Sequence, residues 1–304
     1  MRYVNEEGIK NTDAKLKQFY SSSLAYLERL ETHDEQTLSP YIQLCKNIVS
    51  ADSLILDCGC GTGLSSYLLA KAGFRVIGMD VSPLFLLEGI KKYGKQKGLR
   101  FFVGDVSKLP FPDQSFDIVC SYDLLEHIID IEMVLIEMDR VVKKGGLVII
   151  ITPNHLDPIQ YLKATIKWRK KEIYKPWEAK SRLMALYKFI RSFFLVINKA
   201  LGLNKKIYYL EPVLSNNKDA CGRDFDATWL TNYFDIENIL KELGFSIKDA
   251  FFSFEDKIMP IIRLLHLPKI LLSFYVKIRA PSIIIRADKM KKSSLKSLTI
   301  SSHN

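Results

Sequence analysis

The chain has 304 residues, of which 48% are apolar and 26% are charged, which is typical of a globular protein and excludes disorder of the whole chain. No uncharged apolar run approaches the length of a bilayer span, so no transmembrane helix is expected. Residues 1–10 carry charges and no apolar core, which argues against a signal peptide.

The net charge of +10 is distributed unevenly along the chain. Residues 155–220 hold 14 Lys and Arg against 5 Asp and Glu, and residues 257–304 hold 10 against 1. The remainder holds 20 against 28, so two basic segments interrupt an acidic body. The five cysteines form an odd set without a CxxC pair or a His partner at metal spacing. This favours reduced thiols in a cytoplasmic protein over a disulfide framework, and no metal site is expected.

The first 50 residues contain apolar residues at helical spacing, and we expect an N-terminal helical segment that packs beside or over a site. From there on, short β-rich runs alternate with helical runs, which predicts a parallel sheet with helices on both faces. Strands are expected at residues 53–58, 75–80, 99–105, 116–121 and 147–152.

Three helices between these strands and after them have recognisable ends. Ser82 and Pro83 open one helix as its N-cap and first-turn proline. Residues 131–142 are expected to form another, which the Lys-Lys-Gly-Gly run at 143–146 ends. A later helix is expected at residues 228–243, with Gly244 following its last residue.

The stretch from Ile55 to Gly63 joins the first strand to a helix through an acid and three alternating glycines. Glycine tolerates positive φ and lets a ligand approach the main chain, and the first amides of the following helix are free to bind a ligand. A strand, a glycine turn and a helix predict a nucleotide-type site. The spacing Asp-x-Gly-x-Gly-x-Gly nevertheless differs from the phosphate-binding Gly-x-Gly-x-x-Gly, and no P-loop lysine follows.

Two further strands are expected to end in acids at the same edge of the sheet. Asp80 follows Gly63 by seventeen residues, close to the position of the ribose-binding carboxylate in a dinucleotide fold. Asp57 and Asp105 would repel a pyrophosphate, but they would favour a ligand that carries cationic groups.

At this point the sequence resembles the class I S-adenosylmethionine-dependent methyltransferases, over about residues 50–154. The matching landmarks, in order, are Ile55 to Gly63, Met79-Asp80, Gly104-Asp105 with residues 109–117, Leu125-Glu126-His127, and residues 141–146. The Leu-Glu-His motif is similar to that of the methyltransferase type 11 subgroup that includes quinone-biosynthesis O-methyltransferases. The resemblance implies a Rossmann-like, seven-stranded, mostly parallel α/β sheet, with the last strands at residues 245–254 and 282–287.

The resemblance also implies S-adenosylmethionine as the cofactor. Asp57 and the three glycines would surround its methionine part, Asp80 would bind the ribose hydroxyls, and Asp105 would lie beside the adenine. An acid can accept both ribose hydroxyls, and the sulfonium and ammonium groups are positive. The implied cofactor-binding residues are Asp57, Gly59, Cys60, Gly61, Gly63, Asp80, Val81, Asp105, Val106, Ser121 and Tyr122.

Methyl transfer from a sulfonium needs mostly positioning and, for a hydroxyl acceptor, a base. His127 follows the fourth strand and His155 follows the fifth, so both are candidate catalytic residues. Either histidine can instead be a scaffold residue bonded to a backbone carbonyl.

Residues 155–220 form a basic insertion after the fifth strand. Within it, apolar residues recur at helical spacing, with Lys188, Arg191 and Lys199 around the stripe. A basic amphipathic helix predicts one of three things: a cover over a lipophilic substrate, a peripheral contact with an anionic membrane, or a helix packed on the body with its charges in water. The apolar positions are Leu183, Leu186, Ile190, Phe193, Phe194, Ile197 and Leu201.

Residues 257–281 are likewise apolar and basic, and the two segments are expected to share one surface near the substrate side. The expected organisation is an N-terminal helical segment, a cofactor-binding core, a basic helical insertion that caps the substrate, the rest of the core, and a disordered Lys- and Ser-rich tail. The corresponding ranges are 1–50, 51–154, 155–220, 221–289 and 290–304.

The sequence therefore predicts a cytoplasmic methyltransferase that acts on a small or lipid-linked acceptor, most readily on oxygen, at the inner face of a membrane. An RNA methyltransferase competes with this interpretation, because basic stripes with aromatics also suit nucleic acid. Both basic segments are more apolar than a surface that tracks phosphates requires, which disfavours nucleic acid. The patterns also allow a regulator that binds the cofactor without turnover and, more remotely, an NAD enzyme. Acceptor identity and oligomeric state are not encoded in these patterns.

Overall fold

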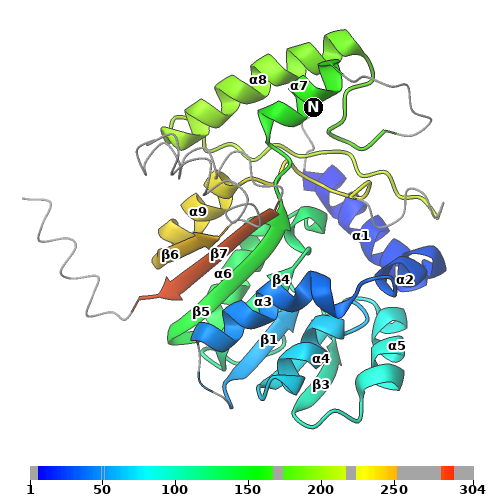
Figure 1. Ribbon diagram of the computed structural model, residues 1–304, viewed down its shortest axis with the longest axis vertical. Helices are drawn as coiled ribbons and strands as arrows, with labels where there is room; N and C mark the ends of the chain where they lie inside the picture. Colours follow the sequence, from blue (N-terminus) through cyan, green and yellow to red (C-terminus); the bar gives the residue numbers. More distant parts are fainter. Residues whose placement is uncertain are drawn as a thin grey trace, which may run out of the picture.

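The computed structural model describes residues 6–48, 50, 52–166, 174–216, 224–251 and 282–290. Seven strands form one sheet in the order β3-β2-β1-β4-β5-β7-β6. The first five strands are parallel, whereas β7 runs antiparallel to both β5 and β6, so the predicted mostly parallel α/β sheet is confirmed (Figure 1). The strands are β1 Leu54–Cys58, β2 Arg75–Asp80, β3 Leu99–Val103, β4 Phe116–Tyr122, β5 Val142–Pro153, β6 Phe245–Phe251 and β7 Ser282–Lys289.

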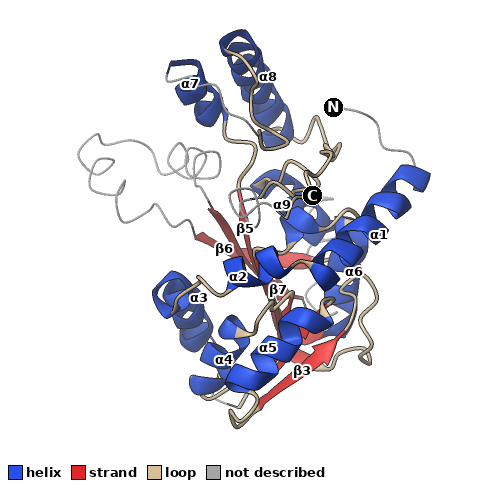
Figure 2. Cartoon of the chain, turned by 90° about the vertical axis from the view of Figure 1, so that its right-hand side faces the viewer, coloured by secondary structure: helices blue, strands red, loops and turns tan. Residues whose placement is uncertain are grey.

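Helices cover both faces of this sheet (Figure 2). One face is packed by α3 and α4, which bury Tyr41 and Leu69, and the other by α6 and α9, which bury Met138 and Ile236. Each apolar sheet face thereby gains a cover of helices. The helices are α1 Glu6–Ser22, α2 Leu24–Leu30, α3 Glu35–Ile48, α4 Leu64–Lys71, α5 Pro83–Tyr93, the 3-10 turn η1 Leu125–His127, α6 Ile131–Val141, α7 Pro158–Ile166, α8 Arg182–Ala200 and α9 Tyr233–Glu242.

The strand order reverses next to β1, which lies between β2 and β4. In open α/β sheets, ligands bind outside the carboxyl ends of the strands at such a switch point. The loops that follow β1 and β4 are the glycine turn and the segment leading into η1, so the fold brings the two predicted site segments together.

Several predicted element boundaries were wrong, and strand β5 begins at Val142 rather than at Leu147. Strand β3 ends at Val103, because Gly104 and the Asp105 turn leave the ladder. Helix α6 ends at Val141, since Val142 is already extended and pairs with Phe116 in the sheet.

Helix α9 begins at Tyr233 rather than at Thr228. The hydroxyl of Thr228 bonds the backbone carbonyl of Ile128, the indole of Trp229 bonds that of Leu125, and Asn232 caps the helix. These bonds hold residues 228–232 in an extended conformation against η1. The C-terminal end agrees with the prediction, because Gly244 follows the helix with a φ of +85°.

The basic insertion forms α7 and α8, which pack against each other beyond the carboxyl edge of the sheet (Figure 1). No helix in the described part of the chain is long and apolar enough to cross a membrane. Cys45, Cys58, Cys60 and Cys120 are free and buried. The second basic segment at 257–281, Cys221, the end of the predicted sixth strand and all but the first residue of the tail lie outside the described residues.

Candidate active site

Two adjoining cavities lie where the glycine turn meets the end of β4. The volumes of the two cavities, including the open solvent at their mouths, are about 730 and 710 Å³. They share six wall residues, so they lie directly beside each other. The shared residues are Tyr26, Leu30, Gly59, Gly61, Asp123 and His127.

The glycine turn shapes the floor of both cavities. Gly59, Gly61 and Gly63 have φ values of +69°, +55° and +80°, which side-chain-bearing residues rarely adopt. A Cβ on Gly63 would lie 2.4 Å from the ring of Phe101, so this glycine makes room for packing and does not line either cavity. Gly59 and Gly61 do line them, and Cys60 lines one.

Two buried carboxylates hold the turn in place. Asp57 accepts hydrogen bonds of 2.6 Å from the hydroxyls of both Ser65 and Ser66, and burial raises its pKa to about 6. It orients the start of α4 and lines neither cavity. Asp80 accepts the backbone N–H of Gly61 on one oxygen and that of Ser82 on the other, each at 2.9 Å. Asp80 and its neighbour Val81 line the cavity nearer to β2.

Asp105 lines the same cavity and contacts the N-terminal helix. Its carboxylate is ion-paired with Lys17 of α1 and accepts a hydrogen bond from the hydroxyl of Ser107. Partial burial opposes the charge, but these two partners outweigh it and lower the pKa of Asp105. Val106 and the α1 residue Leu16 also line the wall, so α1 lies over the predicted cofactor site.

The second cavity is bounded by the end of β4. Tyr122 lines it, whereas Ser121 is fully buried in the strand and does not. Asp123 follows with a φ of +48°, an uncommon conformation outside glycine. Its side chain is open to the cavity, yet the surrounding protein and the Asp224 carboxylate raise its pKa.

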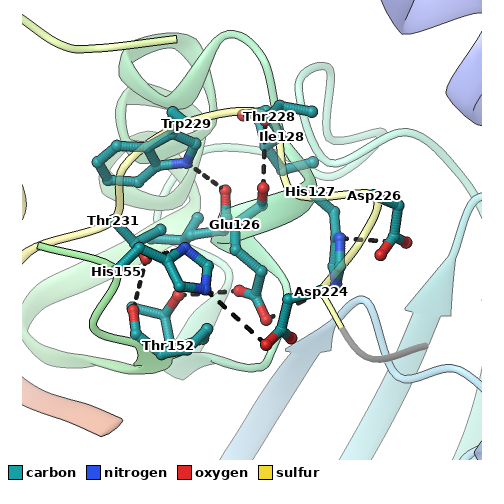
Figure 3. A network of polar contacts seen from close by, with 12 residues as sticks. Glu126, His127, Ile128, Thr152, His155, Asp224, Asp226, Thr228, Trp229 and Thr231 are labelled. Atoms are coloured by element: carbon teal, nitrogen blue, oxygen red, sulfur yellow. Dashed lines mark hydrogen bonds and ion pairs between the residues drawn. The ribbon is translucent and has the colours of Figure 1, made fainter. Parts of the chain in front are cut away.

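His127 lines both cavities and belongs to a polar network, in which it lies between Glu126 and Asp226 (Figure 3). Its Nδ1 is 3.3 Å from Asp226, and its Nε2 is 3.6 Å from Glu126. The Asp226 carboxylate also accepts a 2.7 Å hydrogen bond from Tyr20 of α1. Burial alone lowers the pKa of His127, but the carboxylates, Asp226 foremost, raise it to about 9. The neighbouring carboxylates therefore favour the protonated form of His127.

His155 lies on the far side of the network and lines neither cavity. Its ring stacks on Trp177 of the insertion at a centroid distance of 3.9 Å, and its Nδ1 is 2.9 Å from the hydroxyl of Thr231 (Figure 3). Burial lowers its pKa. Its Nε2 is 3.9 Å from Asp224, so it reaches the site only through that carboxylate.

Three carboxylates of the network, Asp123, Glu126 and Asp224, differ in how tightly they hold a proton. Burial opposes the charge of Asp224, but His155 and Lys175 outweigh it and hold its pKa at about 2. Glu126 is fully buried, accepts a 2.8 Å hydrogen bond from Thr152, and has a raised pKa because of burial. The network therefore contains one firmly ionised carboxylate beside two carboxyls, Glu126 and Asp123, that hold protons more tightly.

Several wall residues were not predicted from the sequence. Asp123, Asp224 and Lys17 each reach a cavity, as does Tyr20. The pair Asp224 and Asp226 in the stretch 221–229 was visible as a run of acids, but no local spacing ties it to a histidine one hundred residues earlier. No residue of the described part of the insertion lines either cavity, and the cap over the substrate stays a prediction.

Comparison with known proteins shows what the chain is similar to. Residues 56–150 match the family model described as a methyltransferase domain. The match covers about a third of the chain. The chain is 39% identical to a demethylmenaquinone methyltransferase of Thermobifida fusca over 129 residues, which is 42% of this chain and 54% of that protein. It is 38% identical to a 2-methyl-6-phytyl-1,4-hydroquinone methyltransferase of Synechocystis over 107 residues, 35% of this chain and 34% of that protein.

The chain thus spans about half or less of the length of these two relatives. A solved structure of a putative S-adenosylmethionine-dependent methyltransferase from Listeria monocytogenes aligns with a TM-score of 0.52. The alignment covers 83% of this chain and 99% of the Listeria chain at 15% sequence identity, so it shows a shared fold.

S-adenosylmethionine is the predicted cofactor, and the residues of the site fit it. Gly59 and Gly61 present bare backbone to the cavity, where a Cβ on Gly59 would meet the side chain of Leu124 at 2.6 Å. Each oxygen of Asp80 has one backbone donor and keeps a lone pair for a ribose hydroxyl. Of the eleven predicted cofactor-binding residues, eight line the cavities, and the three that do not are Asp57, Gly63 and Ser121. The role of these residues in binding the cofactor stays a prediction.

Proposed function

We propose that the protein transfers a methyl group from S-adenosylmethionine to an oxygen atom of a small, lipid-linked acceptor. The observation that carries this proposal is the pair of adjoining cavities beside the segment that matches a methyltransferase domain. One is walled by Asp80 and Asp105 and the other by Tyr122 and Asp224, while the glycine turn, Asp123 and His127 line both. The names of the two relatives, which refer to a demethylmenaquinone and a phytyl hydroquinone, support an acceptor of that chemical class.

S-adenosylmethionine supplies an electrophilic methyl group on a sulfonium. The residues of this chain then have to position a hydroxyl acceptor and remove its proton. We assign proton removal to Asp123, because it lies on the wall shared by the two cavities and its pKa is raised. A base whose pKa is raised toward the working pH combines availability with proton affinity. Its left-handed backbone conformation is of the kind that recurs at functional sites.

The two predicted histidines receive different roles in this proposal. His127 stays protonated and contacts the acceptor cavity, where its positive charge keeps the neighbouring carboxylates from repelling one another. It stabilises the ionised form of Asp123 in the same way. His155 is a positioning residue, because it acts on the site only through Asp224. His155 takes no proton from the acceptor in this scheme, because it lines neither cavity and does not reach the acceptor.

The first test separates cofactor binding from turnover. Calorimetric titration of the purified protein with S-adenosylmethionine should show saturable binding, and a folded protein without affinity would refute the cofactor assignment. Transfer is then measured with methyl-labelled cofactor and a hydroquinone that carries an isoprenoid tail, beside the same hydroquinone without a tail. We expect label on a hydroxyl oxygen and a preference for the tailed compound. Label on a ring carbon would contradict the assignment to oxygen, and labelled RNA would contradict the acceptor class.

The second test addresses the base. Asp123→Asn should lower kcat about 100-fold or more, with the affinity for S-adenosylmethionine little changed. In the unmodified protein kcat/KM should rise with pH, because the carboxylate must lose its proton before it can act. Glu132→Gln on the exposed surface of α6 is the matched control and should behave like the unmodified protein. A kcat for Asp123→Asn within threefold of the control would rule out Asp123 as the base.

A further inference from the structure

The helix α8 shows its apolar side to the solvent. Seven large apolar side chains of this helix are between 39% and 81% exposed, and Leu201 and Leu203 just after its end are 66% and 73% exposed. On a helical wheel, all of the seven except Met184 fall within about a third of the circumference, and no charged residue lies between these. The seven are Leu183, Met184, Leu186, Tyr187, Ile190, Phe193 and Phe194. We call these seven residues with Leu201 the apolar arc.

The opposite side of α8 packs Leu195 and Val196 into the main core and also holds the helix on the body through polar contacts. Lys199 is only 2% exposed, and its ammonium pairs with the buried Asp235 of α9 and donates to the backbone carbonyl of Lys206. Lys188 donates to the backbone carbonyls of Trp177 and Glu178, each at 2.9 Å. Turning the helix to bury its apolar arc would leave Asp235 without its cation, which is costly for a buried charge. The outward orientation of the arc is therefore fixed by the pairing of its polar face.

This arrangement argues against one of the three sequence interpretations. A helix packed on the body with its charges in water would bury its apolar stripe and expose its lysines. In α8 two lysines are directed toward the protein, and the apolar stripe is exposed. An uninterrupted apolar face about 28 Å long requires a partner other than water.

The positive charge of this region favours an anionic partner. The insertion as a whole carries 14 Lys and Arg against 5 Asp and Glu, and exposed cations stand beside the arc at Lys180 and Arg182 and on α7 at Lys163. A second copy of the same face would bring two such positive regions together, which disfavours a symmetric dimer. Anionic lipid headgroups attract these cations, while the acidic remainder of the chain is repelled and stays away from the surface.

We infer that α8 lies in the plane of an anionic membrane surface, with its apolar arc among the acyl chains and its flanking cations at the headgroups. The insertion also connects this surface to the site, because Trp177 stacks on His155 and Lys175 pairs with the cavity residue Asp224 at 3.5 Å. A docked α8 therefore holds the cavities at a membrane in which a lipid-linked acceptor dissolves. This last consequence rests on the proposed function, whereas the docking itself does not.

The docking is tested without any activity measurement. The full-length protein is sedimented with vesicles of phosphatidylcholine alone and of phosphatidylcholine and phosphatidylglycerol in equal amounts. We expect binding to the anionic vesicles that weakens with added salt. The triple variant Leu183→Gln, Ile190→Gln, Phe194→Gln should bind more weakly by about tenfold or more, because it removes apolar insertion and leaves the charge unchanged.

A matched control has equally exposed apolar residues at another place. Leu87 and Ile90 of α5 are 57% and 50% exposed, and the variant Leu87→Gln, Ile90→Gln should bind vesicles like the unmodified protein. Circular dichroism checks that both variants keep the fold. The inference is overturned if the unmodified protein ignores anionic vesicles, if both variants bind equally well, or if the triple variant instead abolishes a dimer in sedimentation equilibrium. Failure here with intact methyl transfer in detergent would leave the proposed function standing.

Discussion

The buried ion pair between α8 and α9 gives the most quantitative prediction. Lys199 and Asp235 are 2% and 3% exposed, and the second oxygen of Asp235 is occupied only by the amide of Asn232. Lys199→Met keeps the length of the side chain and removes the charge, so the Asp235 carboxylate stays buried without its cation. Removing one partner of a buried pair costs about 3–5 kcal/mol, and the free energy of unfolding should fall by this amount.

The chain provides its own control for this substitution. Lys205 pairs with Glu242 at 2.7 Å between nearly the same two elements, but both side chains are 64% exposed. Lys205→Met should change the free energy of unfolding by less than about 1 kcal/mol, because water screens an exposed pair. The double variant Lys199→Met, Asp235→Asn should recover most of the loss, since it removes the orphaned charge as well.

The measurement is urea unfolding followed by circular dichroism, with the slope against denaturant required to stay constant across the variants. Equal losses for Lys199→Met and Lys205→Met would refute the argument that burial decides the strength of the pair. A double variant that is no better than Lys199→Met would show that the loss comes from packing of the side chain and not from the unpaired carboxylate. The argument for the fixed orientation of α8 would then lose its main support.

Two further predictions concern the site. The pKa of His127 is raised from 6.5 to about 9 in the folded state, so its contribution to stability is complete below pH 6.5 and is lost as the pH rises through about 9. His127→Gln should flatten this part of the stability profile measured by thermal unfolding, and an unchanged profile would contradict the assigned charge. Gly63→Ala and Gly73→Ala both place a side chain at positive φ, at +80° and +103°, but only the first meets a neighbour, the ring of Phe101. In urea unfolding Gly73→Ala should cost about 1 kcal/mol and Gly63→Ala about 1–3 kcal/mol more, and equal costs would refute the packing role of Gly63.

Much of the cofactor side could be predicted because its signals are local. Gly59 and Gly61 lie in the turn after one strand, and Asp80 ends the next strand along the chain. Glycine at these two positions indicates the positive φ that the turn requires, and Asp80 accepts the backbone N–H of Gly61. The acceptor side could not be predicted in this way. It brings together Asp123, His127 and Asp224 from loops about one hundred residues apart, and these residues become neighbours only in the folded chain.

The sequence by itself determined the mostly parallel sheet, the loops after its strands that carry the ligand-binding residues, and the resemblance of the central segment to methyltransferases. These features could be predicted because hydrophobic periodicity and glycine spacing act over short distances along the chain. Tertiary structure decided the charge states and the direction of α8. Its apolar stripe was visible in the sequence, but which side faces the body depends on the buried pairing of Lys199 with Asp235, thirty-six residues later. An amphipathic pattern shows that a helix has two faces; only the contacts of the folded chain decide which of them meets the solvent.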